Sequence, residues 1–245
     1  MPIRAHHRLP AGSRAAAAAA LLPVLALAAG CGGGGGKDGP TVAKGEVSTA
    51  KLTSALLTSQ DVPHVQVLPA GSKQQLLGDA QKADTAACQP IVDQWSSQPR
   101  YRRQVYTGAM VTDTTDATST ATKGAKAISL TVIASYKKGD AARVLHDLAA
   151  AVTACHSYSV VRGGVTSHFT VRPAAADAGL GDERVAYVIG DSAKGTGGQV
   201  LVTVIRVGDT TAAYETVRAD HQPAQLRSSI PVEQVAKLRK AAKHS

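Results

Sequence analysis

The sequence predicts an α+β domain with a single antiparallel sheet and helices packed on one face of that sheet. The first indication is the order of the elements, because strand-like runs arrive in groups instead of alternating one by one with helices. The second is composition: 44% of the residues are hydrophobic, yet the chain has one Trp and one Phe. The core is therefore expected to consist mainly of Val, Leu, Ile and Ala.

The first half of the predicted domain contains two helices and a short strand. A helix is expected from Ser48 to about Leu57, with Ser48 as its N-cap, ending ahead of Pro63. The run VQVLPAG, residues 65–71, predicts a short strand. A second helix is expected from about Ala83 to Ser97, because Cys88, Ile91, Val92 and Trp95 share one helical face.

The middle of the chain predicts two strands followed by the clearest helix. The strands cover Gln104–Thr112 and a run centred on Ser129–Tyr136, separated by a Thr-rich loop at residues 113–124. The helix extends from Ala141 to about Ser157, since its apolar residues recur at helical spacing.

The last part of the chain predicts an antiparallel meander and a terminal helix. Four strand-like runs occupy residues 166–173, 183–191, 198–208 and 210–219. Gly208-Asp209 between the last two is a tight hairpin signal. Residues 229–245 predict a basic amphipathic helix with Pro231 near its start.

Residues 1–30 have the layout of a secretory signal peptide. A short positive segment precedes the apolar run Ala15–Ala29, and small residues then lead into Cys31. The apolar run contains Pro23 and is shorter than the roughly 20 residues that span a bilayer, so a permanent transmembrane helix is the lesser alternative.

The end of the apolar run resembles the bacterial lipoprotein signal, with Ala29 and Gly30 before the lipid acceptor Cys31. The family pattern has Leu three residues before the Cys, whereas here Ala28 stands there and Leu27 lies one place further out. Ala26-Leu27-Ala28 also has the form that ordinary signal peptidase cleaves, which would give a secreted protein. We expect lipidation of Cys31, a glycine-rich tether over residues 31–46 and a folded domain over residues 47–245. The tether would reach about 20 Å.

The three cysteines, Cys31, Cys88 and Cys155, are an odd number for an exported protein. Lipid on Cys31 would leave Cys88 and Cys155, each on the apolar face of its own predicted helix. We therefore expect these two to form a disulfide in an oxidising compartment. The alternative is two buried, reduced thiols that behave as small hydrophobic side chains.

The sequence contains no motif that identifies a catalytic centre. Zinc-protease, phosphate-loop and dinucleotide-binding patterns are missing, and the histidines have no metal-ligand spacing. We therefore expect no cofactor, no metal site and no enzymatic activity. The net charge of +9 comes without a dense basic patch interleaved with aromatics, which argues against nucleic-acid binding.

Several runs resemble the PknH-like extracellular sensor domains of actinobacteria and lone lipoproteins of that type. They are ALLTSQDVP, ACQPIVDQW, SLTVIASYKKGDAARVLHDLAAAVTAC, AGLGDERVAYVI and VTVIRVGD. The resemblance implies an α+β sandwich-like domain with a groove for an extracellular ligand. This chain departs from kinase-linked members in having one cysteine pair where they commonly have two, and no kinase or transmembrane helix, so it is not expected to signal inward on its own.

Together these observations predict a lipid-anchored binding or interaction domain on the outer face of the cell membrane. The membrane would be reached through the N-terminal lipid, and the binding partner would be a small molecule, a cell-wall fragment or a protein. The alternatives are an accessory structural lipoprotein without a small ligand and, less favoured, an envelope hydrolase. The ligand-binding residues are not identified by the sequence.

Overall fold

The computed structural model describes residues 48–115, 127–191, 198–218, 220 and 223–243. The chain divides after Thr41, and Val42–Ser245 form one compact unit. The predicted signal segment 1–30, the predicted lipid acceptor Cys31 and the predicted tether at 31–46 lie outside the described residues, so these assignments stay predictions. Most of the Thr-rich loop lies outside them as well.

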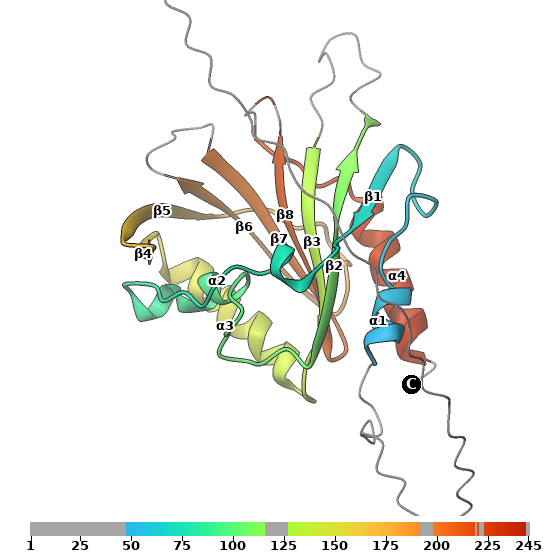
Figure 1. Cartoon of the computed structure of the whole chain (residues 1–245), viewed down its shortest axis with the longest axis horizontal. Coiled ribbons are helices and arrows are strands. Elements are labelled where there is room, and N and C mark those ends of the chain that lie inside the picture. Colours follow the sequence, from blue (N-terminus) through green and yellow to red (C-terminus); the bar gives the residue numbers. More distant parts are fainter. Residues whose placement is uncertain (1–47, 116–126, 192–197, 219, 221–222, 244–245) are drawn as a thin grey trace, which may run out of the picture. The chain divides into compact units, whose positions relative to one another are not determined.

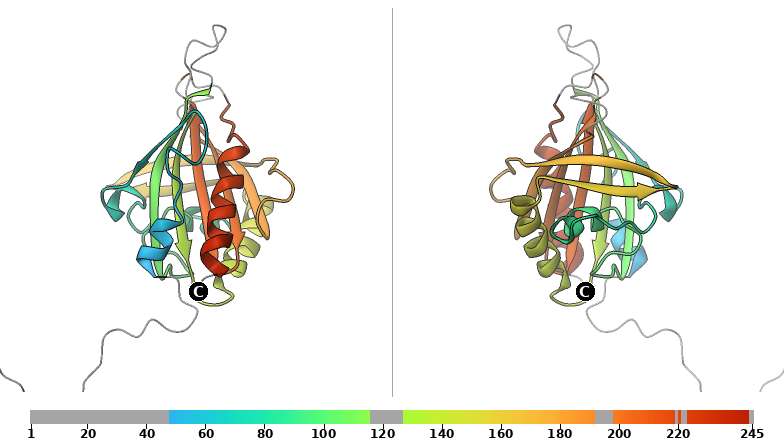
Figure 2. Two further views of the ribbon diagram at one scale, coloured as in Figure 1. Left: turned by 90° about the vertical axis from the view of Figure 1, so that its right-hand side faces the viewer. Right: turned by 90° about the vertical axis from the view of Figure 1, so that its left-hand side faces the viewer.

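Eight strands form one antiparallel sheet in the order β1-β2-β3-β8-β7-β6-β5-β4, which confirms the α+β class and the single sheet (Figure 1). The sheet is strongly twisted, so that β5 runs across the direction of β2 and β3 (Figure 2). The strands are β1 (Val65–Pro69), β2 (Val105–Asp113), β3 (Ala127–Ser135), β4 (Ser157–Arg162), β5 (Val165–Pro173), β6 (Glu183–Asp191), β7 (Gln199–Val207) and β8 (Thr210–Arg218).

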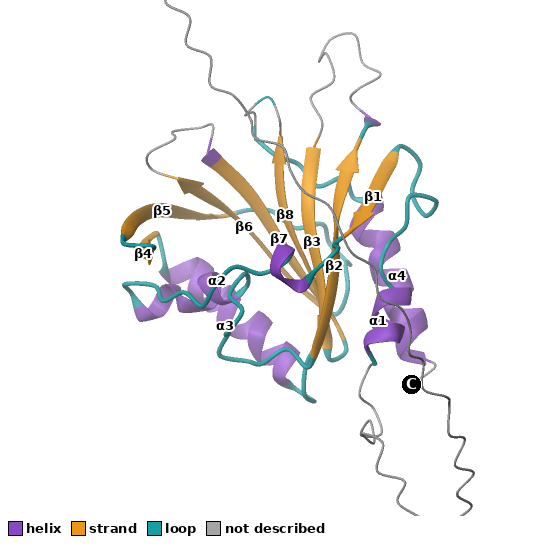
Figure 3. Ribbon diagram, in the orientation of Figure 1, coloured by secondary structure: helices purple, strands orange, loops and turns teal. Residues whose placement is uncertain are grey.

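Four α-helices accompany the sheet in the described part of the chain (Figure 3). The N-cap of the first is the predicted one, because the side chain of Ser48 accepts a hydrogen bond from the backbone N–H of Lys51 at 3.2 Å. The helices are α1 (Thr49–Ser54), α2 (Gln89–Asp93), α3 (Asp140–Ala154) and α4 (Ser229–Lys243), with 3₁₀ turns η1 (Lys73–Gln75) and η2 (Ala86–Cys88).

The helices divide between the two faces of the sheet, whereas the sequence predicted one face. We call the face covered by α2 and α3 the α3 face, and the face covered by α1 and α4 the α4 face. The reason lies in the central strands, where consecutive residues are both apolar and buried. Val204 and Ile205 of β7 contribute to different cores, as do Ala212 and Ala213 of β8. Strands buried on both sides need a cover on both sides.

The predicted helix at 83–97 is shortened at both ends. At its start, the backbone N–H of Asp84 donates to the carbonyl of Ser159 in β4, which keeps the chain extended there. At its end, the guanidinium of Arg103 donates to three backbone carbonyls, those of Asp93, Gln94 and Ser96, at 2.6–2.9 Å. Because the Arg103 side chain supplies the hydrogen bonds that these carbonyls need, they do not require helical partners. The helix therefore ends at Asp93 and does not continue to Ser97.

Strand β4 was not predicted, because its first residue had been assigned to the end of α3. The helix stops at Ala154, and alternating burial of Tyr158 and Val160 then marks a strand. Gly163 and Gly164, both with positive φ, form the two-residue turn into β5. This glycine pair was the signal in the sequence that indicated a hairpin.

Candidate functional site: an apolar groove around Glu215

A groove of about 360 Å³ lies on the α3 face, between the sheet and the segment that carries η1 and α2. Its lining is mostly apolar and comes from segments far apart in the chain. Toward the sheet it is lined by Leu130, Ile189, Val200 and Glu215, along β4 and β5 by Tyr158, Val160, Arg162 and Phe169, and along the η1–α2 segment by Gln74, Gln75, Leu76, Leu77, Gly78, Gln81, Ile91, Val92 and Trp95.

Glu215 is the carboxylate among these residues, and its position follows from the strand period. In β8 it lies two residues after Ala213, so both side chains point to the α3 face. Its cross-strand neighbours are Leu130 of β3 and Val202 of β7, both apolar. No side chain or backbone group of the described residues forms a hydrogen bond or an ion pair with its carboxylate.

The environment of Glu215 disfavours its charge. Burial raises the pKa of its carboxyl to about 7, against an opposing effect of the Arg162 guanidinium. Arg162, at the end of β4, donates from its Nη2 to Oε1 of Gln81 at 2.8 Å, and it forms no ion pair with Glu215. A partly buried acid therefore lies in an apolar groove with a cation nearby but not in contact.

Aromatic side chains adjoin this acid. The rings of Tyr158 and Phe169 stack with centroids 5.3 Å apart. Burial, with a further contribution from the negative charge of Glu215, raises the pKa of both Tyr158 and Tyr187. Within the described part of the chain, the Tyr187 hydroxyl and the Trp95 indole N–H are buried without a hydrogen-bond partner. Trp95 lines the groove, so its wall includes a polar atom that no described group satisfies.

An exposed apolar ledge, Leu68 of β1 and Met110 of β2, continues the cross-strand row in which Glu215 lies. Leu68 pairs with Met110, Met110 with Leu130, and Leu130 with Glu215. Leu68 is 69% exposed and Met110 is 48% exposed. From the groove residue Leu130, the row therefore continues onto apolar surface that the described residues leave exposed.

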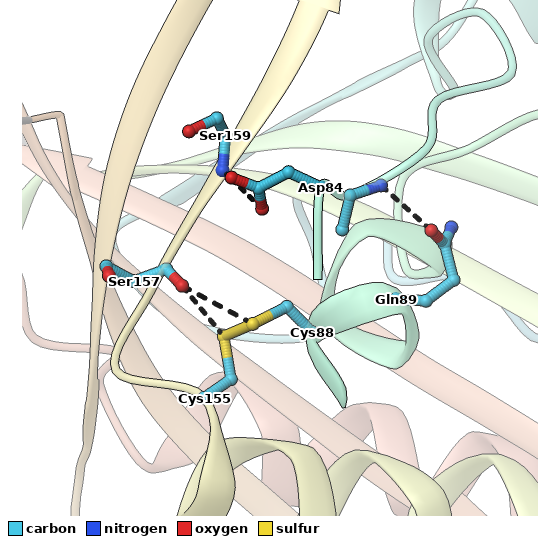
Figure 4. The surroundings of a disulfide bond; sticks show 7 residues. Asp84, Cys88, Gln89, Cys155, Ser157 and Ser159 are labelled. Atoms are coloured by element: carbon cyan, nitrogen blue, oxygen red, sulfur yellow. Dashed lines mark hydrogen bonds between the residues drawn. A yellow bond between two sulfur atoms is a disulfide. The ribbon is translucent and has the colours of Figure 1, made fainter. Parts of the chain in front are cut away.

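The disulfide between Cys88 and Cys155 is present, with the two Cα atoms 5.3 Å apart (Figure 4). This confirms the predicted pair, although Cys88 lies in a 3₁₀ turn and Cys155 directly follows α3. Beside it, the Asp84 carboxylate accepts a hydrogen bond from the backbone N–H of Ser159 at 3.0 Å, which lowers the pKa of Asp84. The disulfide and this contact both fix the segment before α2 against β4, and so hold two walls of the groove together.

Two adjacent acidic side chains at the entry to β6 have a structural partner. Asp182 and Glu183 both pair with Arg206, at 3.3 and 2.7 Å. In the residues that are described, no cluster of three or more His, Cys, Asp or Glu side chains is arranged to hold a metal ion.

Sequence reasoning did not identify Glu215 or Arg162. A signal for Glu215 was available, because it lies two residues after Ala213 on the same strand face, and charged residues are uncommon at inward positions. Arg162 belongs to the strand that was missed, so its position at the groove could not be foreseen.

Comparison with known proteins gives a likeness of fold. No family model and no curated protein matches the sequence. The extracellular domain of PknH from Mycobacterium tuberculosis is similar over 81% of this chain and 98% of that one, with a TM-score of 0.52 and 11% identity. An uncharacterized Mycobacterium smegmatis protein, the Rv0999 ortholog, covers the same shares at 13% identity with a TM-score of 0.33. The fold is thus PknH-like, as the resemblance implied.

Among the helices described by the structure, none combines the length and the apolar character needed to cross a membrane.

Proposed function

We propose that this chain is an extracytoplasmic interaction domain, held at the outer face of the membrane by lipid on Cys31, and that its groove binds a small, largely apolar ligand. The observation that carries the proposal is the groove around Glu215, in which a carboxylate without a contact partner lies among apolar and aromatic side chains. Ligand pockets commonly combine apolar walls with a few polar groups that fix orientation.

Two kinds of observation support the extracytoplasmic location. The N-terminal pattern is that of an exported protein, and the Cys88–Cys155 disulfide fits an oxidising compartment. The likeness to the PknH extracellular domain is one of fold and adds an expectation only. Cleavage at Ala26-Leu27-Ala28, which would release the protein, remains the alternative.

The composition of the groove favours binding over catalysis. Its described lining holds Glu215 but no second carboxylate, and no His, Cys or Ser that could form a nucleophile–base pair with it. An envelope hydrolase would need such a convergent set. The proposal of a binding domain therefore stands ahead of the enzymatic alternative, with an accessory structural role as the second candidate.

Ligand binding in the groove is tested with the neutral apolar dye Nile red and the mature domain. We expect saturable dye fluorescence that is lost in Val200→Trp, which fills the groove, and kept in Val232→Trp. Val232 is an exposed residue on α4, on the other face, so it controls for the added indole. Dye binding that does not saturate, or that both variants leave unchanged, would contradict the proposal.

Lipid attachment is tested separately with Cys31→Ala in the full chain. The wild type is expected in the membrane fraction with the mass of an acylated protein, and the variant without that added mass. A variant that stays in the membrane with an unchanged mass would overturn the lipid anchor and leave the groove untouched.

A further inference from the structure

We infer that the ligand of the groove is an amphiphile with a protonated amine, whose ammonium group pairs with Glu215 while its apolar body lies along Leu130 and the apolar ledge. This inference rests on the proposed function and specifies the chemistry of the ligand. Three independent features support it: the charge in the groove, the aromatic side chains beside it, and the course of the exposed apolar surface.

The charge of the Glu215 carboxylate favours a ligand with a cationic group. A carboxylate that is partly buried among apolar side chains loses hydration, and a cationic partner restores much of that loss. The groups that face Glu215 are Arg162 and Tyr158 from β4 and Tyr187 from β6. Its neighbours on β3 and β7 are apolar, and the η1–α2 wall offers glutamine and Trp95 side chains to the groove. Arg162 donates to Gln81 and forms no ion pair with Glu215, so we expect the ligand to supply the cation.

The aromatic side chains suit an ammonium group. The stacked rings of Tyr158 and Phe169 line the same groove as Glu215. The face of an aromatic ring attracts a cation within about 6 Å. This attraction is stronger when the ammonium group is desolvated than when it is exposed to water. A carboxylate and aromatic rings together favour an amine over an alcohol of the same size.

The exposed apolar surface suits a long apolar body. From Glu215 the row Leu130, Met110, Leu68 crosses three strand spacings, which amounts to about 14 Å. Met110 and Leu68 expose about half or more of their side chains, so an apolar chain lying on them would remove this surface from water. An acyl or alkyl chain follows such a row better than a compact ring system.

The experiment compares three dodecyl compounds that differ in head group: dodecylammonium and dodecanoate, each below its micelle concentration, and dodecanol below its solubility limit. Displacement of Nile red from the groove of the mature domain gives the affinities. At pH 8 we expect dodecylammonium to bind about tenfold or more tightly than dodecanol, and dodecanoate to bind most weakly. Because burial raises the pKa of Glu215 to about 7, the ammonium compound should bind about tenfold more weakly at pH 6 than at pH 8.

The variant Glu215→Gln removes the charge at nearly constant shape. It should reduce dodecylammonium affinity at pH 8 about tenfold, abolish the pH dependence and leave dodecanol unchanged. Glu233→Gln, on α4 and remote from the groove, is the matched control and should alter none of these values.

The outcomes separate this inference from the proposed function. If all three compounds bind alike, or if Glu215→Gln leaves dodecylammonium affinity unchanged, the ammonium inference is wrong while the groove remains a binding site. If none of them displaces the dye from the wild type, the inference fails, and if the dye itself does not bind the groove, the proposed function fails too.

Discussion

The two faces of the sheet treat their buried polar side chains differently. On the α4 face, Gln234 of α4 is fully buried, accepts a hydrogen bond from the backbone N–H of Leu57 at 3.1 Å and donates to the carbonyl of Ala55 at 2.6 Å. On the α3 face, Glu215 has no such partner and adjoins the groove. The same sheet thus uses one polar side chain to join its parts and leaves the other without a partner among the described residues.

An unpaired polar atom alone does not distinguish the faces. The Tyr214 hydroxyl on the α4 face also lacks a hydrogen-bond partner among the described residues, as the Tyr187 hydroxyl does on the other. What the α3 face adds is a carboxylate, aromatic rings and open space in one place. The combination, rather than any single unsatisfied atom, therefore marks the candidate site.

The largest expected effect comes from removing the disulfide that holds the groove walls. Cys88→Ser with Cys155→Ser opens a link of sequence separation 67 and should lower the free energy of unfolding by about 4 kcal/mol in the chain-entropy model. Urea denaturation measures this loss, and Nile red affinity should fall with it. A domain whose stability and dye affinity both survive would show that the walls are held by other contacts.

The next effect breaks the polar link on the α4 face. Gln234→Leu leaves the N–H of Leu57 and the carbonyl of Ala55 buried without their partner, and should cost about 3 kcal/mol. Thermal unfolding is the measurement, with the exposed Gln60→Leu as control. Nile red binding should be unchanged at temperatures where the variant is folded. A loss of binding there would mean that the two faces are coupled.

A smaller effect concerns pH and the acid in the groove. The pKa of the Glu215 carboxyl is raised from 4.5 to about 7 in the folded protein. The protonated carboxyl is therefore the form that the fold favours. Its contribution to stability is fully present below pH 4.5 and is lost as pH rises through 7. The variant Glu215→Gln does not undergo this loss. Its stability advantage over the wild type should therefore be larger at pH 8 than at pH 5, by up to about 3 kcal/mol. Identical pH profiles for the two proteins would show that the carboxyl is well solvated.

The smallest effect is expected at an ion pair on the α4 face. Lys237 Nζ lies 2.6 Å from Oδ2 of Asp61, and both side chains are about one-fifth exposed. Lys237→Met should lower stability by about 1 kcal/mol or less, because partly exposed pairs contribute little. The difference should shrink further in high salt. A loss that exceeds that of Gln234→Leu would reverse the ranking of the two contacts.

The sequence predicted the parts of the fold that depend on local patterns. The strand at Glu183–Asp191 and the N-cap Ser48 were found because alternation and capping are encoded within a few residues. The end of α2 was not predicted, because it depends on hydrogen bonds from Arg103. The helices on both sheet faces were not predicted either, because they depend on packing between segments distant in the sequence. The groove has the same origin. Glu215 lies in β8, Arg162 in β4 and Trp95 just after α2, and only the tertiary fold brings them together.

The most direct test of the account uses Trp95, the chain's single tryptophan, which lines the groove. Its emission is titrated with dodecylammonium at pH 8 in the mature domain. We predict a saturable change in intensity or wavelength for the wild type, and a curve shifted about tenfold to higher concentration for Glu215→Gln. Emission that stays constant while the compound binds by another readout would place the ligand elsewhere and contradict the central claim.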